Sequence, residues 1–133
     1  MEKPETIRAT LAQAYGTTQY WKIYPDLLIT DGVKLMAEMC NAYWLLQDAF
    51  IWLHSDCTKG EEFIVFKLIL DGHSALLSIE DGNYNVLAKQ DISFTDFPLQ
   101  EGIIIYWCDN VLMLLLSIKF KTFYQNFRPS AQS

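Results

Sequence analysis

The residues of this chain that could do chemistry are few, and the most suggestive group stands at helical spacing. Positions i, i+3, i+4 and i+7 of one helix face hold Trp44, Gln47, Asp48 and Ile51. An amide and a carboxylate between large apolar side chains would suit a pocket for a small ligand. The same stripe would also suit the seam of a dimer or the solvent edge of the helix, so the three alternatives stay open.

Two further aspartates, Asp31 and Asp96, each follow a threonine at the expected end of an element. A pair of carboxylates in one cleft could act as general acid and general base. Asp and Thr at such positions also cap helices and form turns, which is the interpretation we favour. Asp31 and Asp96 therefore join Trp44, Gln47 and Asp48 as candidates for binding, and no residue is assigned a catalytic role.

Metal and nucleotide chemistry has little support in the sequence. Histidine and cysteine are the usual ligands of zinc, and the chain has two histidines and three cysteines: His54, His73, Cys40, Cys57 and Cys108. They form no C-x-x-C or H-x-x-x-H spacing, and no glycine-rich phosphate loop occurs. We expect no metal and no cofactor, and we expect the cysteines to be free thiols in a reducing cytoplasm.

The overall composition indicates a single domain, residues 1–133, that is rich in apolar surface. The 133 residues are 51% hydrophobic and 14% aromatic, with a net charge of −6. So small a domain has little interior, and we expect part of its apolar surface to lie in a homodimer interface. Scattered basic residues disfavour nucleic acid. Without a signal peptide or a membrane-spanning run, we expect a cytoplasmic protein that does not bind membranes.

Three helices are expected in the first half of the chain, and two of them carry the candidate residues. The apolar spacing predicts helices over residues 4–15, over a stretch that Thr30 or Asp31 caps and Asn41 ends, and over residues 42–54. Residues 17–29 are aromatic and contain Pro25, so we expect irregular structure packed on the core.

The second half has the pattern of strands separated by turns, with the sheet beginning at Phe63. Asp-Gly at 71–72 and at 81–82, and Asp-Asn at 109–110, each separate apolar stretches, which favours hairpins. Two-residue turns at the first two sites would pair Phe66 with Leu77 and Leu77 with Val86. One face would then be apolar and the other wetter. We expect an α+β fold with N-terminal helices packed on one face of an antiparallel meander of about five strands.

The pattern changes again after residue 116. Aromatic residues recur at helical spacing at Phe120, Phe123, Tyr124 and Phe127. This spacing predicts a short amphipathic C-terminal helix. The helix could dock on a partner, or it could fold back onto the sheet of its own chain, which we favour.

Four ordered motifs resemble those of an uncharacterised bacterial family. They are TDGVK at 30–34, AYWLL at 42–46 followed by Asp48, DGN at 81–83 and TDFPL at 95–99. The similarity covers roughly residues 16–116 and leaves 117–133 as an aromatic extension. Members of the family are small proteins of unknown function, common in cyanobacteria and on mobile elements. The resemblance implies a compact bacterial domain and no particular activity.

These observations favour a non-enzymatic interaction or binding module that forms a homodimer or binds a protein partner. The alternative is a small enzyme or ligand-binding protein. Its pocket, between helices and sheet, would combine Trp44, Gln47 and Asp48 with Asp31 or Asp96. A phage-type inhibitor of a host protein is a third class, which a small, acidic, aromatic chain fits by analogy alone.

Overall fold

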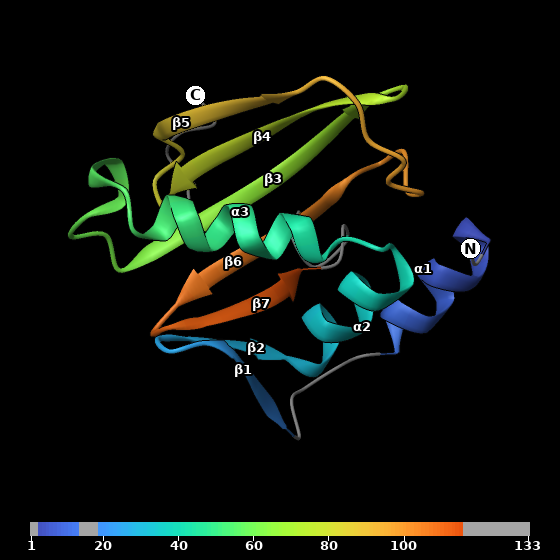
Figure 1. Ribbon diagram of the computed structural model, residues 1–133, viewed down its shortest axis with the longest axis horizontal. Helices are drawn as coiled ribbons and strands as arrows, with labels where there is room; N and C mark the ends of the chain where they lie inside the picture. Colours follow the sequence, from blue (N-terminus) through green and yellow to red (C-terminus); the bar gives the residue numbers. More distant parts are fainter. Residues whose placement is uncertain (1–2, 14–18, 116–133) are drawn as a thin grey trace.

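The computed structural model describes residues 3–13 and 19–115, where three α-helices lie beside a seven-stranded sheet (Figure 1). The helices are α1 (Pro4–Ala12), α2 (Asp31–Met39) and α3 (Tyr43–Leu53), and a short 3₁₀ turn, η1, covers Asp56–Thr58. The strands are β1 (Tyr20–Tyr24), β2 (Leu27–Thr30), β3 (Phe63–Asp71), β4 (Ser74–Asp81), β5 (Val86–Ile92), β6 (Ile103–Cys108) and β7 (Val111–Leu115). The α+β class is confirmed, whereas the expected C-terminal helix lies outside the described residues.

The sheet is larger than expected and is mixed, with the strand order β1-β2-β7-β6-β3-β4-β5. Strands β2 and β7 pair in parallel, and the other neighbours are antiparallel. The prediction of irregular structure over 17–29 was wrong, because β1 and β2 form a hairpin there. Pro25 falls in the turn between them, where no ladder hydrogen bond is needed from it. The parallel contact includes a hydrogen bond of 2.9 Å from the Leu28 amide to the Asn110 carbonyl.

The β3–β4 hairpin turns one residue later than expected, so the predicted pairing of Phe66 with Leu77 was wrong. Asp71 pairs with Ser74, and Phe66 pairs with Ile79. Gly72 has φ +64° at the first central position of the turn, which is where a type II′ turn places glycine. The register therefore differs from the prediction by two residues. An even shift leaves every side chain on its expected face.

The β4–β5 connection is longer than a two-residue turn, because the Asp81 side chain organises it. Its carboxylate accepts hydrogen bonds from the amides of Asn83 and Asn85, at 2.7 and 3.0 Å, and from the Asn85 side chain, at 2.9 Å. Burial alone would raise the pKa of Asp81, but these three donors bring it below its ordinary value. Ile79 consequently pairs with Ala88, and the expected pairing of Leu77 with Val86 was wrong by four residues.

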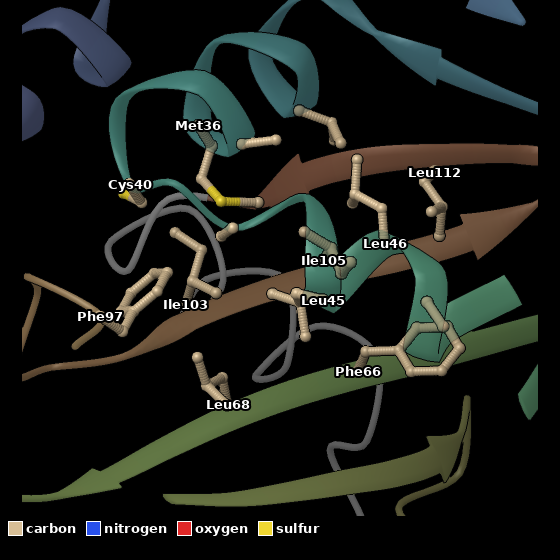
Figure 2. Packing of buried hydrophobic residues seen from close by; sticks show 14 of the residues in the cluster. Met36, Cys40, Leu45, Leu46, Phe66, Leu68, Phe97, Ile103, Ile105 and Leu112 are labelled. Carbon is tan, nitrogen blue, oxygen red and sulfur yellow. The ribbon is translucent and has the colours of Figure 1, made fainter. Parts of the chain in front are cut away.

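The core lies between α2, α3 and one face of the sheet (Figure 2). Strand alternation directs Ile64, Phe66 and Leu68 of β3 toward the helices, where they meet Leu45 and Leu46 of α3. The burial of these side chains is complete or nearly so. Figure 1 shows α3 lying across β3 and β6. One side of this helix therefore packs on the sheet, and the opposite side faces solvent.

Helices α2 and α1 are positioned differently. Helix α2 starts directly at the end of β2, where the Thr30 hydroxyl accepts a hydrogen bond from the Val33 amide at 3.4 Å. We expected α1 to pack on the sheet, but it packs on α2 instead. A bidentate ion pair, with Arg8 donating to Glu101 at 2.7 and 3.0 Å, links α1 to the segment before β6.

Replacing Gly102 by Ala should destabilise the fold strongly. Gly102 has φ +77°, and a Cβ there would lie 1.9 Å from the backbone carbonyl oxygen of Leu68. The left-handed conformation and the backbone clash together should lower the free energy of unfolding by about 3 kcal/mol. Urea denaturation of both proteins would measure this difference.

Gly72→Ala is the matched control. Gly72 also has positive φ, but a Cβ there meets nothing within 4 Å. Conformational strain alone should then cost about 1 kcal/mol. Equal losses for the two variants would show that the contact with Leu68 is not the reason for the glycine.

Candidate functional site

The face of α3 that carries the candidate stripe divides into a packed side and an exposed side. Trp44 is half-buried and packs against the core, whereas Gln47 is exposed. Ile51 is 58% exposed and Tyr43 is 46% exposed, four residues on either side of Gln47. Positions 43, 47 and 51 follow one another along the helix, so they form a solvent-facing stripe.

Asp48 takes part in a polar link between α3 and β5. The Trp52 indole N–H donates to the Gln90 side-chain oxygen at 2.7 Å, and the Gln90 amide donates to the Asp48 carboxylate at 3.1 Å. All three side chains are half-buried, so each bond satisfies a polar group that would lose water on burial. The arrangement joins α3 to an edge strand, so Asp48 has a structural role.

Asp31 lies at the opposite edge of the sheet. It is the first residue of α2, and its carboxylate accepts a hydrogen bond of 3.0 Å from the Trp21 indole of β1. The ammonium group of Lys34 lies 4.6 Å from the centre of the Trp21 ring, a cation–π contact. Lys34 also pairs with Glu38 at 2.7 Å, and the Tyr43 hydroxyl donates to Glu38 at 3.4 Å.

Asp96 is exposed on the connection between β5 and β6. The neighbouring Thr95 is buried, its hydroxyl accepts a hydrogen bond from the Phe97 amide, and its own amide donates to the His73 carbonyl. Thr95 and Phe97 therefore anchor this connection to the core, while Asp96 points to solvent.

The five candidate residues are thus spread over three places. Asp31 contacts β1 and Asp48 contacts β5, which are the two edge strands of the sheet, and Asp96 lies on a connecting segment. Trp44 and Gln47 share α3 with Asp48. General acid–base chemistry needs both groups within reach of one substrate, whereas Asp31 and Asp48 are bonded to opposite edge strands and Asp96 is exposed on a connecting segment.

A cluster of aromatic and charged side chains at the C-terminal end of α3 was not expected from the sequence. The Tyr24 and Phe50 rings stack with centres 4.0 Å apart, and Phe50 is followed by the His54 ring at 4.4 Å. His54 contacts the Phe50 carbonyl at 3.0 Å and the Asp26 carboxylate at 2.8 Å. Both contacts raise the pKa of His54. The hydrogen bond to the Phe50 carbonyl has the larger effect, and the hydrogen bond to the Asp26 carboxylate has the next largest. The cluster fastens the β1–β2 turn to α3.

The Cys40 thiol shows no sign of activation. Burial raises the pKa of the Cys40 thiol to about 11, so it is a poor nucleophile at neutral pH. Within residues 3–13 and 19–115, no group of three or more His, Cys, Asp or Glu side chains could hold a metal ion. No helix in the same ranges is long and apolar enough to cross a membrane.

The fold and the surface define an α+β domain whose polar side chains serve mainly its own architecture. The chain belongs to the family of unknown function DUF6876, whose model matches residues 5–117. The expected membership in a family of unknown function is thereby confirmed, and the match begins at Glu5, earlier than the motifs alone indicated. No curated protein matches the chain, and no solved structure does.

Replacing Asp48 by Ala should weaken the link between α3 and β5. The Gln90 amide loses its acceptor in a half-buried position, so the free energy of unfolding should fall by about 1 kcal/mol. Gln47→Ala, on the exposed side of the same helix, should change it by less than about 0.5 kcal/mol. Chemical denaturation compares the variants, and an unchanged midpoint for Asp48→Ala would contradict the structural role.

The His54 contacts should stabilise the protein more in acid than in base. A raised pKa means that the folded state holds the proton more tightly than the unfolded chain, whose histidine pKa is about 6.5. The contribution is therefore complete below about pH 6.5 and is lost as the pH rises through the folded pKa.

Thermal unfolding of the wild type and of His54→Gln at acidic and at basic pH would test this. The difference between the two melting temperatures should be larger at the acidic pH. A difference that does not change with pH would show that the protonated imidazole contributes nothing to Asp26 and Phe50.

Proposed function

We propose that this chain is a non-enzymatic binding module that forms a homodimer through the exposed side of α3. The observation that carries the proposal is the exposure of Tyr43 and Ile51 on a helix whose other sides are packed against the core. Large apolar side chains that recur along one solvent-facing helix stripe mark an interaction surface. Burying them against a second copy would contribute roughly 25 cal/mol for each Å² of apolar area removed from water.

The surface extends beyond α3. We call it the helical surface and define it by Trp21, Lys34, Glu38, Tyr43, Gln47 and Ile51. Tyr43 touches Glu38, Glu38 pairs with Lys34, and Lys34 lies over the Trp21 ring, so the contacts run without a break from α3 to β1. Trp21 is 38% exposed. Tyr and Trp are the residue types that supply most of the binding energy at protein interfaces.

A second copy of the chain is the partner that the charges favour. The chain as a whole carries a charge of −6, which opposes the approach of another acidic surface. On the helical surface, however, Lys34 and Glu38 lie side by side with their charges balanced. A two-fold axis that passes between Lys34 and Glu38 would place each charge near its opposite in the other copy. The resemblance to a bacterial family and the free cysteines support a bacterial cytoplasmic setting.

Replacing Ile51 by Glu should dissociate the dimer. A carboxylate at this position would have to be desolvated at the interface, which is unfavourable without a partner for the charge. Gel filtration with light scattering should give twice the 15.4 kDa chain mass for the wild type and the chain mass itself for Ile51→Glu.

Val86→Glu is the matched control, because Val86 is 49% exposed but lies on β5, away from the helical surface. This variant should remain dimeric. A monomeric wild type at micromolar concentration, or equal dissociation of both variants, would refute the proposed interface.

A further inference from the structure

The sheet face turned away from the helices is buried where the sequence led us to expect a wetter surface. Val65 is 0% exposed, although strand alternation points it away from the core that Ile64 and Phe66 enter. On the neighbouring strand, Ser78 is 3% exposed and Glu80 is 6% exposed. The part of this face around Val65, Ser78 and Glu80 on β3 and β4 therefore lacks the solvent contact of an open sheet.

The side chains of this face would suit a cover that is apolar and aromatic. We call it the outer face, formed by Phe63, Val65, Lys67, Ser78, Glu80, Ile104 and Tyr106. The rings of Phe63 and Tyr106 stack with centres 5.2 Å apart. The outer face is thus apolar on β6 and at Phe63 and Val65 of β3, and polar at Lys67 of β3 and on β4.

The polar part of the outer face also has the properties of a sheltered surface. The Lys67 ammonium lies 3.1 Å from one Glu80 oxygen, and the Ser78 hydroxyl donates to the other at 3.0 Å. The Glu80 side chain is 8% exposed and that of Lys67 is 21% exposed. Removing such a pair from water is costly unless hydrogen bonds compensate, so it belongs to an interior rather than to a bare sheet.

We propose that the aromatic extension of this chain, residues 117–133, lies against the outer face. It follows directly from β7, which ends at Leu115 beside β6. As a helix, the extension would reach roughly 25 Å at 1.5 Å per residue. That length spans the strands from β7 to β4, which are spaced about 4.8 Å apart. The stripe of Phe120, Phe123 and Phe127 would supply the apolar contacts.

The alternative occupant is a second copy of the chain, and two observations disfavour it. Val65 and Glu80 are already buried within a single chain. In addition, a tethered segment meets the face at an effective concentration in the millimolar range, far above that of a second copy. The family match ends at residue 117, so the extension would be an addition to the family domain. The proposal is independent of the dimer through α3.

Photocross-linking of the full chain tests the proposal. The photoreactive residue p-benzoylphenylalanine replaces Tyr106 on the outer face, in an equal mixture of isotopically light and heavy protein. Irradiation should join position 106 to residues 117–133, and mass spectrometry should find light-to-light and heavy-to-heavy products. Light-to-heavy products would assign the face to a second copy. Products with sheet neighbours such as Phe63 alone, and none with residues 117–133, would exclude the extension. Either result would overturn the proposal.

Two controls accompany this measurement. The same photoreactive residue in place of Ile51, on the opposite side of the sheet, should give no product with residues 117–133. A full-length variant with Phe120→Ser and Phe123→Ser should lose the Tyr106 product, because the apolar contacts are removed. An Ile51 product with the extension, or an undiminished Tyr106 product in the Ser variant, would overturn the assignment. Failure of the α3 dimer would leave all these expectations unchanged.

Discussion

The parallel pairing of β2 with β7 is the constraint on which the rest of the structure depends. It joins the N-terminal hairpin to the meander, and it is secured by backbone hydrogen bonds such as that from Leu28 to Asn110. Because α2 starts at the residue that follows β2, fixing this strand also fixes the start of the helix. The short connection to α3 then leaves that helix lying across β3 and β6, as Figure 1 shows. The position of Trp21 against Asp31 and Lys34 follows from the same pairing.

Side chains that suggest chemistry serve mainly as connectors in this fold. Asp81 organises a loop, Asp48 joins a helix to an edge strand through Gln90, and Asp31 holds the indole of Trp21. Each carboxylate is committed to a donor from the protein itself, which lowers its value as a catalytic group. The exposed side of α3 instead carries the large apolar side chains of Tyr43 and Ile51, and for this reason association explains that side better than catalysis does.

The two faces of the sheet have different roles. The helix side holds the core and, above it, the helical surface that we assign to a second copy. The outer face holds Val65 and the Lys67–Glu80 pair, both sheltered from water. The cover that we propose for the outer face would bury more apolar surface than helices on one side alone allow, in agreement with the high hydrophobic content of so short a chain.

The sequence by itself determined the period-two pattern of β3 and β4, the turn at Asp109 and Asn110, and a helix beginning at Thr30 or Asp31. These features depend on neighbouring residues: alternation sets the face of a side chain, and positive φ or a hydroxyl cap marks an end. Register could not be obtained in the same way, because a shift by two or four residues preserves the alternation.

Only the tertiary structure decided that the hairpin of β1 and β2 joins the sheet, since β2 attaches to it by pairing with β7, which lies far along the chain. It also separated Asp31 from Asp48 and brought His54 to Asp26. Such contacts arise when the whole chain packs, and local spacing carries no record of them.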